Sequence, residues 1–297
     1  MSHVLTLIAP PAGLTSAHLA AARGALMALG ADCDAPDWLA ENEAVDLPFA
    51  ALAAEQAIAA ARGALGDAPI DLIAQPAEGR RKKLLLADMD STIVTSETLD
   101  EIAAFAGLKD KIAEITARSM NGELDFQQAL IQRVGMLKGL DASALEETWK
   151  TTELTPGAAV LVATMRAHGA HTALVSGGFT FFTGRVAELV GFHEHHANTL
   201  LLEGGKLAGT VGMPILDRDA KLATLKRLAA SLGLALTETI TVGDGANDLA
   251  MIQAAGLGIA YHAKPVVAAA ARHRINHTDL RSLLYAQGFH AAEFAAT

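Results

Sequence analysis

The spacing of apolar residues changes at about residue 84 and divides the chain into two predicted regions. In the first region the predicted strands lie at residues 3–9, 32–38, 44–50 and 70–74, and helical spacing of alanine and leucine occupies residues 15–29 and 51–65. The order βαββαβ is typical of a ferredoxin-like unit. We therefore predict an α+β domain over residues 1–76.

From residue 84 onward, short apolar runs alternate with long helical segments, which is typical of a parallel sheet covered by helices. The predicted strands are residues 84–87, 172–175, 239–242 and 257–260. Helix-period apolar positions between the first two strands extend too far for one crossover helix. We therefore expect an α/β, Rossmann-like domain over residues 84–297, with a helical cap inserted at about 97–152. Glycines near the middle of residues 200–211 predict a small hairpin.

A polar, basic stretch separates the two regions. It runs Glu78-Gly79-Arg80-Arg81-Lys82-Lys83, and residues 77–83 are expected to form a linker. The basic run is interpreted as a solvated boundary rather than as a binding patch.

Composition narrows the possible functions. The 297 residues are 51% hydrophobic and 19% charged, and their formal net charge is -10. An acidic chain has little general attraction for nucleic acid or for an anionic membrane surface, so we expect neither as a partner. The chain has a single cysteine, no basic leader and no apolar run long enough to span a bilayer. These features favour a cytoplasmic protein.

The first strand of the second region ends at two carboxylates, Asp88 and Asp90. In an extended backbone, side chains two residues apart point to the same side. Two neighbouring carboxylates do not both stay ionised easily without a cation, so the pair is a candidate for metal binding or acid–base chemistry. The alternative is a solvated turn that caps a helix, because Asp, Ser and Thr are favoured there.

Other predicted strand ends carry polar groups, and ligands of open α/β sheets bind at that edge. Ser176 and Gly177 follow residues 172–175, and Asp244, Asn247 and Asp248 follow residues 239–242. Glycine backbone lets N–H groups approach a phosphate, and carboxylate and amide oxygens suit Mg²⁺. Lys221, at the start of a predicted helix, is a candidate cation beside a phosphate. Taken singly, these motifs are also compatible with ordinary loops, turns and a surface lysine.

Taken together, the motifs resemble those of the haloacid dehalogenase superfamily of phosphotransferases. The matching residues are Asp88-x-Asp90-x-Thr92, Ser176, Lys221 and Gly243-Asp244-Gly245-x-Asn247-Asp248. The sequence Asp88-Met89-Asp90-Ser91-Thr92, the Ser176-Gly177-Gly178-Phe179 motif, Glu97 and Arg133 are similar to the phosphoserine phosphatase branch. The resemblance covers about residues 84–285 and implies hydrolysis of phosphoserine, the last step of serine biosynthesis.

The resemblance also implies roles for the matching residues. Asp88 would be the nucleophile that forms an aspartyl-phosphate, and Asp90 would transfer the proton. Mg²⁺ would bind the carboxylates of Asp88 and Asp244 and the main-chain carbonyl of Asp90. The phosphoryl oxygens would be held by Ser176, Gly177 and Lys221, with Asn247, Asp248 and Thr92 in supporting positions.

The predicted cap would select the substrate. Phosphoserine has an ammonium and a carboxylate, which Glu97 and Arg133 would bind. Met120 and Phe126 resemble the residues that close over the substrate and exclude water. Each has an ordinary alternative: a glutamate favoured at a helix N-terminus, an exposed helix arginine, and apolar residues of the cap core.

Two alternatives and one open question remain at the level of sequence. Another small phosphate monoester could be the substrate, and a phospho-accepting receiver domain also phosphorylates an aspartate at a strand end. The N-terminal region resembles ACT-type modules that sense amino acids, but packing or formation of a homodimer would explain it equally well.

Overall fold

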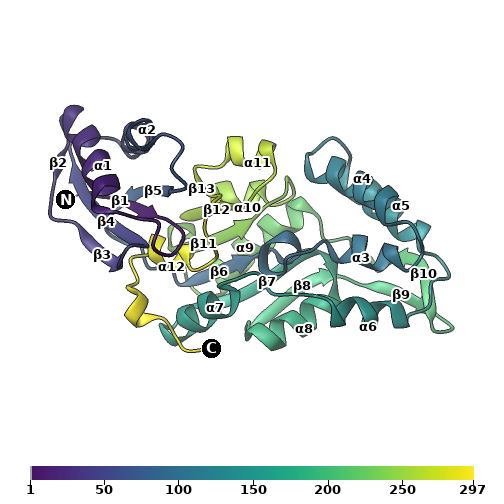
Figure 1. The fold of residues 1–297 in the computed structure, drawn as a ribbon. Coiled ribbons are helices and arrows are strands. Elements are labelled where there is room, and N and C mark those ends of the chain that lie inside the picture. Colours follow the sequence, from purple (N-terminus) through teal and green to yellow (C-terminus); the bar gives the residue numbers. More distant parts are fainter. Residues whose placement is uncertain (1) are drawn as a thin grey trace.

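The computed structural model describes residues 2–297 and places two large β-sheets next to each other, with a helical cap at the end remote from the N-terminus (Figure 1). Each sheet has its own hydrophobic core on at least one face. Among the described residues, no helix is both long and apolar enough to cross a membrane.

The first sheet is antiparallel and has the strand order β2-β4-β1-β5, with β3 also paired to β4. Its strands are β1 (His3–Ile8), β2 (Asp32–Cys33), β3 (Asp37–Ala40), β4 (Ala44–Ala50) and β5 (Asp71–Pro76). Helices α1 (Ser16–Ala28) and α2 (Ala54–Leu65) cover one face. This is the ferredoxin-like arrangement that the βαββαβ pattern predicts. The prediction of one strand at residues 32–38 was wrong, because two short strands, β2 and β3, pair separately with β4 there.

Both faces of the first sheet are buried, because alternate strand residues point to opposite sides. Leu7 packs under α1 and α2, whereas its neighbour Ile8 packs into the core shared with the second sheet. The near-continuous apolar run of β1 reflects this double burial.

The second sheet is parallel and has the order β13-β12-β11-β6-β7-β8. Its strands are β6 (Leu84–Ala87), β7 (His171–Phe179), β8 (Glu194–Asn198), β11 (Thr239–Gly243), β12 (Leu257–Tyr261) and β13 (His273–Ile275). The two edge strands, β8 and β13, were not predicted. Strand β8 consists of polar residues and alanine, and β13 has three residues, so neither shows an apolar run.

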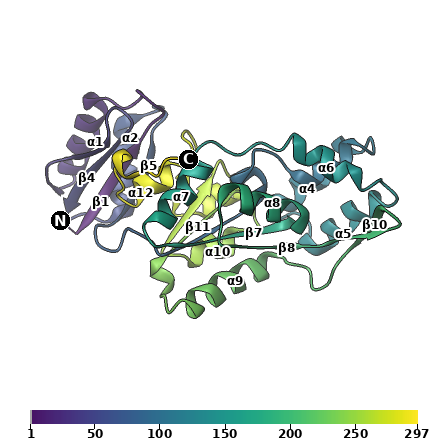
Figure 2. The same cartoon turned by 90° about the horizontal axis from the view of Figure 1, so that it is seen from below.

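Helices cover both faces of this sheet (Figure 2). One face packs against α9 (Arg218–Ser231) and α10 (Leu249–Ala254) through Leu84 and Leu86. The other face packs against α7 (Ala158–Ala167), α8 (Thr180–Val190) and α12 (Ser282–Ala286). The short helix α11 (Pro265–Ala270) connects β12 to β13.

The cap consists of α3 (Thr98–Ala104), α4 (Lys109–Met120), α5 (Phe126–Met136) and α6 (Ser143–Lys150). The predicted hairpin forms β9 (Leu200–Glu203) and β10 (Lys206–Val211), and it packs against the cap. The Leu207 N–H donates to the Leu140 carbonyl at 2.8 Å, so a segment that follows β8 completes the cap.

The prediction of a solvated linker was wrong for Arg80. Its guanidinium bonds both carboxylate oxygens of Asp46 on β4, at 2.5 and 3.1 Å, and also donates to the carbonyls of Tyr285 and Ala286. Because its partners come from the first sheet and from α12, which packs on the second sheet, Arg80 joins the two halves of the molecule. A charged side chain inside a basic run gives no sign in the sequence that it is paired within the fold.

Candidate active site

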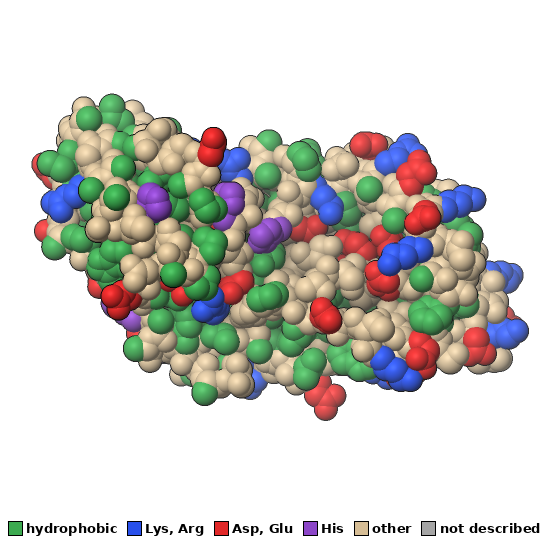
Figure 3. All heavy atoms as spheres, viewed as in Figure 1, with side chains coloured by type: hydrophobic (Ala, Val, Ile, Leu, Met, Phe, Trp, Pro, Cys, Tyr) green, Lys and Arg blue, Asp and Glu red, His purple; other side chains and the backbone are tan. Residues whose placement is uncertain are grey.

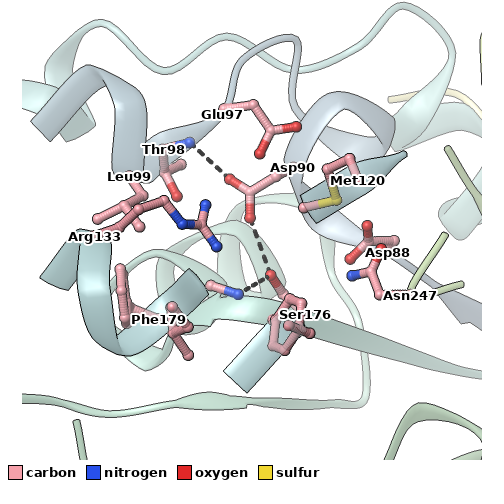
Figure 4. A pocket seen from close by; sticks show the side chains of 14 residues that line it. Asp88, Asp90, Glu97, Thr98, Leu99, Met120, Arg133, Ser176, Phe179 and Asn247 are labelled. Carbon is pink, nitrogen blue, oxygen red and sulfur yellow. Dashed lines mark hydrogen bonds between the residues drawn. The ribbon is translucent and has the colours of Figure 1, made fainter. Parts of the chain in front are cut away.

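The predicted site residues meet at the carboxyl ends of β6, β7 and β11, beneath the cap. The pocket there has a volume of about 20 Å³, room for little more than one water molecule. Its lining includes Asp88, Asp90, Glu97, Met120, Phe126, Arg133, Ser176, Gly177 and Asn247. Figure 4 shows these side chains converging from the sheet and from the cap, and acidic side chains gather along the boundary between cap and sheet in Figure 3.

Asp88 shares the buried ammonium group of Lys221 with Asp248. Lys221 Nζ lies 2.7 Å from Asp88 Oδ1 and 2.5 Å from Asp248 Oδ1, and its side chain is fully buried. Burial opposes the charge of Lys221, but the two carboxylates together raise its pKa. Burial and the charge of Asp248 raise the pKa of Asp88, although Lys221 opposes this. Lys221 is therefore a fixed cation inside the site and not a surface lysine.

Asp90 is held through both carboxylate oxygens. Oδ1 accepts the backbone N–H of Thr98 at 2.8 Å, and Oδ2 accepts the hydroxyl of Ser176 at 3.0 Å. The Gly178 N–H in turn donates to Ser176 Oγ at 2.8 Å. Burial raises the pKa of Asp90, and these hydrogen bonds reduce the rise. Asp88 and Asp90 are 4% and 8% exposed, so the solvated-turn interpretation of this segment was wrong.

The backbone between the strand and the cap makes this arrangement possible. A tight bend over Met89–Ile93 follows β6, and Ser91 takes a positive φ of 54° within it. The bend turns the chain back, so that Asp90 faces β7 rather than continuing along the strand. A residue in the left-handed region is unusual outside glycine and asparagine, and it occurs here next to the site.

Asp244 has the chemistry of a metal ligand. Its Oδ1 accepts from the Thr92 hydroxyl at 3.4 Å, while its buried Oδ2 has no hydrogen-bond partner among the described residues. The nearest ammonium to Oδ2, on Lys264, is 3.8 Å away. Burial and the charge of Asp248 raise the pKa of Asp244 to about 7. A cation at Oδ2 would give this oxygen a partner and would offset the repulsion from Asp248. These residues therefore fit a divalent metal ion.

Geometry groups Asp248, rather than the Asp90 side chain, with Asp88 and Asp244 as carboxylates that lie close enough to share an ion. However, Asp248 Oδ1 accepts from Lys221 at 2.5 Å, and its Oδ2 accepts from the Gly245 N–H at 3.1 Å. Both of its oxygens are thus engaged by the protein. Asp248 is better suited to hold Lys221 than to bind a cation directly.

Two polar groups of the cap face this centre. Glu97 Oε1 accepts from the Ser91 hydroxyl at 2.8 Å, and burial together with the charge of Asp90 raises its pKa to about 8. Arg133 is only 3% exposed and donates to the Thr116 hydroxyl at 2.9 Å. Arg133 is therefore not an exposed helix arginine, whereas Glu97 is half-buried and does lie at the N-cap of α3, although its side chain makes no capping hydrogen bond.

Apolar cap residues cover the pocket. A Cβ at Gly177 would lie 2.5 Å from Cζ of Phe126, so the ring rests directly on the glycine backbone. The Met120 carbonyl accepts the Ala246 N–H at 3.0 Å. The cap therefore lies against the sheet in this structure, and glycine at position 177 is required by that contact.

Three residues that shape the site were not predicted from the sequence. Asn198 donates to the Gly177 carbonyl at 2.8 Å and accepts the Leu216 N–H at 2.7 Å, which ties the β7 loop to the segment before α9. Thr98 supplies the N–H for Asp90, and Thr116 contacts Arg133. A lone Asn at a strand end or Thr in a helix has no motif around it, so only the fold brings these residues to the site.

Comparison with known proteins agrees with this geometry. A family model of haloacid dehalogenase-like hydrolases matches residues 82–256. The chain is similar to the phosphoserine phosphatase of Streptomyces coelicolor, with 39% identity over 298 residues that cover 99% of this chain and 72% of the relative.

Two solved structures extend the similarity to the fold. One is described as a phospho-aspartyl intermediate analogue of phosphoserine phosphatase; it has a TM-score of 0.66 and 40% identity, and the match covers 69% of this chain and 98% of that one. The other is a haloacid dehalogenase family hydrolase from Salmonella enterica, with a TM-score of 0.82, 30% identity and coverage of 95% and 97%. The second match includes the N-terminal domain.

Proposed function

The chain belongs to the haloacid dehalogenase-like hydrolases, and from that premise we propose that it is a phosphoserine phosphatase that catalyses the last step of serine biosynthesis. The observation that carries the proposal is a pocket that Asp88 lines at its base and Glu97 and Arg133 line from the cap, with the buried ammonium of Lys221 2.7 Å from Asp88 Oδ1. One end matches a phosphate monoester, and the other matches the ammonium and carboxylate of an amino acid.

Binding neutralises charge at both ends of the pocket. Lys221, the Ser176 hydroxyl and the Gly177 N–H would hold the phosphoryl oxygens, and Arg133 would bind the carboxylate. The substrate ammonium would face Glu97, whose raised pKa reflects burial and repulsion by Asp90. An arriving cation offsets that repulsion and favours the ionised carboxylate.

In the first step, an oxygen of Asp88 attacks phosphorus, and the bond between phosphorus and the serine oxygen breaks. Asp90 gives its proton to the departing oxygen, so serine leaves as the alcohol. The raised pKa of Asp90 supports this role, because a buried carboxyl keeps a proton more readily than an exposed one. The product of the step is an aspartyl-phosphate on Asp88.

In the second step, Asp90 removes a proton from a water molecule, whose oxygen attacks phosphorus. The bond from phosphorus to Asp88 breaks, which releases phosphate and restores both aspartates. Phe126 and Met120 cover the pocket and limit the access of other water.

We propose Mg²⁺ as the cofactor, held by Asp88, Asp244 and the main-chain carbonyl of Asp90. The ion would supply positive charge that offsets the dianionic phosphate during attack. Asp244 Oδ2, which no donor from residues 2–297 reaches, supports this assignment. Asn247, whose Oδ1 has no partner among the described residues, would orient the substrate or a metal-bound water.

Phosphate release from phosphoserine tests the proposal. Wild type should turn over phosphoserine with Mg²⁺ and lose activity in EDTA, and Asp88→Asn should lower kcat on the order of 10³-fold or more. Phosphoglycolate serves as the comparison substrate. Equal turnover of phosphoserine and phosphoglycolate, or an active Asp88→Asn variant, would contradict the proposal.

A further inference from the structure

A buried series of hydrogen bonds connects Arg133 to Thr116 and Asp100. Arg133 Nη1 donates to Thr116 Oγ1 at 2.9 Å, and Thr116 Oγ1 lies 2.6 Å from Asp100 Oδ1. The three side chains come from α5, α4 and α3, so the series links three helices of the cap. All three residues are less than 10% exposed.

The direction of each hydrogen bond follows from the donors available. A guanidinium only donates, so the Thr116 hydroxyl accepts from Arg133 and has one proton left to give. That proton can go to Asp100 or to the Ile112 carbonyl, which is 3.0 Å away. The shorter contact and the carboxylate charge favour Asp100, because hydrogen bonds to ionised acceptors are stronger.

This series of hydrogen bonds leaves the edge of the Arg133 guanidinium that faces the pocket without a partner among the described residues. Its Nε donates to the Ala129 carbonyl at 3.1 Å, and Nη1 donates to Thr116. Among the contacts of the described residues, these use two of its five N–H groups, and both N–H groups of Nη2 remain. Figure 4 shows the guanidinium directed into the pocket toward Asp90. The free edge can therefore bind a carboxylate through two parallel hydrogen bonds.

We propose that Thr116 and Asp100 are positioning residues that hold Arg133 in the orientation that binds the substrate carboxylate; this rests on the function proposed above. Asp100 also supplies a negative charge, and the Thr116 hydroxyl lies between this charge and the guanidinium. Without this series of hydrogen bonds, the arginine keeps its charge but can swing away from the substrate, so binding of the carboxylate weakens while phosphoryl transfer is largely retained.

Two ligands that differ in one group separate this role from a general one. Phosphoserine carries the carboxylate, and O-phosphoethanolamine keeps the phosphate and the ammonium but lacks it. Thr116→Val removes both the acceptor and the donor with little change of shape. We expect it to raise the KM for phosphoserine about 10- to 100-fold, while kcat changes about 3-fold or less. The inhibition constant of O-phosphoethanolamine should stay within about 2-fold.

Control variants show whether a change in KM comes from loss of the Thr116 hydroxyl or from a general effect of substitution in the cap. Thr116→Ser keeps the hydroxyl and should behave like wild type. Thr148→Val is the matched control, because Thr148 is also a buried cap threonine, and its hydroxyl has no partner among the described residues. Asp100→Asn should raise the KM for phosphoserine in the same direction as Thr116→Val, and it decides the question if Thr116→Val does not fold.

The outcomes separate this inference from the function on which it rests. An unchanged KM in folded Thr116→Val and Asp100→Asn overturns the positioning role, and so does an equal rise of the KM and of the O-phosphoethanolamine inhibition constant. Failure of wild type to hydrolyse phosphoserine overturns the proposed function instead.

Discussion

Two clusters of charged side chains, one at the domain junction and one at the active site, differ in how completely their members are paired. At the domain junction, Arg80 bonds both oxygens of Asp46, and Asp71 accepts from two backbone N–H groups and the Thr278 hydroxyl. At the active site, carboxylates outnumber cations around Lys221, and Asp244 Oδ2 is without a partner among the described residues.

The difference separates structural from functional burial of charge. A fully hydrogen-bonded ion pair holds two surfaces in one register and leaves no group for a ligand. An acidic cluster with a free oxygen lowers stability, but it can bind a cation or an incoming phosphoryl group. Substitutions in the two clusters should therefore have opposite effects on stability and on catalysis.

Asp244→Asn should give the largest effect. We expect kcat to fall on the order of 10³-fold, since a proposed metal ligand is lost. Stability without metal should rise instead. The pKa of Asp244 is raised from 3.8 to about 7, so the folded state binds more protons than the unfolded state between these values and loses stability as pH rises through them. Urea unfolding at pH 8 in EDTA should show Asp244→Asn more stable by about 1–3 kcal/mol.

Asn247→Ala is the control for this prediction, because it alters the same pocket without removing a charge. A destabilised Asp244→Asn variant, or a gain in stability that persists at pH 4, would show that repulsion between carboxylates is not the cause.

Arg80→Met should give the opposite result. Removing the guanidinium leaves the Asp46 carboxylate buried without a cation, with the Thr6 hydroxyl as its remaining donor, which costs about 3–5 kcal/mol. The junction lies away from the pocket, so kcat for the folded fraction should stay within about 2-fold of wild type. Urea unfolding and steady-state kinetics on the same samples measure the two quantities.

The double variant Arg80→Met, Asp46→Asn tests the cause. Removal of the stranded charge should recover at least half of the lost stability. If the double variant is as unstable as Arg80→Met, the loss comes from packing and from the Tyr285 and Ala286 carbonyls rather than from the ion pair.

His273 on β13 is buried outside the active site but, unlike Arg80 and Asp71, it is incompletely hydrogen-bonded. It is 4% exposed, its Nδ1 has no partner among the described residues, and burial aided by Arg272 and opposed by Glu55 lowers its pKa to about 4. Below pH 6.5 the unfolded chain takes up a proton that the folded chain does not, so stability is lost as pH falls toward 4. We expect a loss of about 2 kcal/mol from this group between pH 7.5 and 5.

His273→Gln isolates that contribution, because glutamine does not titrate. The difference in unfolding free energy between wild type and variant should change by this amount over the same pH range. A constant difference would place the acid sensitivity in other groups.

Sequence patterns predicted those strands of the second sheet that are buried on both faces. Strands β6 and β11 are apolar on both faces and end at the aspartates, so both their extent and their edge could be inferred from the sequence. Strand β8, Glu-His-His-Ala-Asn, is half-exposed, and its only strand partner among the described residues is β7. Such edge strands depend on their neighbour for their conformation, and their own residues carry little signal.

The same contrast applies to the site. The proximity of residues at the strand ends could be predicted from the sequence, because the carboxyl ends of parallel strands lie at one edge of the sheet. Arg80 and Thr116 could not, since their partners lie on elements whose relative positions are set by tertiary packing. Asp46 is 34 residues from Arg80, and Asp100 is 16 residues from Thr116.

The smallest predicted effect concerns the contact that joins the cap to the sheet domain at the protein surface. Gln127 Nε2 at the start of α5 donates to Asp217 Oδ2 at 2.6 Å, and Asp217 Oδ1 caps α9, the helix that carries Lys221. Because the pocket beneath the cap has room for little more than one water molecule, the cap must lift to admit substrate.

Gln127→Ala removes this exposed hydrogen bond, which is worth about 0.5–1 kcal/mol, so the closed cap should lose about 2- to 5-fold in population relative to the open one. We expect the KM for phosphoserine to rise by that factor without a change in stability. Gln128→Ala, an exposed neighbour whose side chain makes no hydrogen bond among the described residues, is the matched control. An equal effect of both variants would mean that α5 itself, rather than the contact with Asp217, sets the closure of the cap.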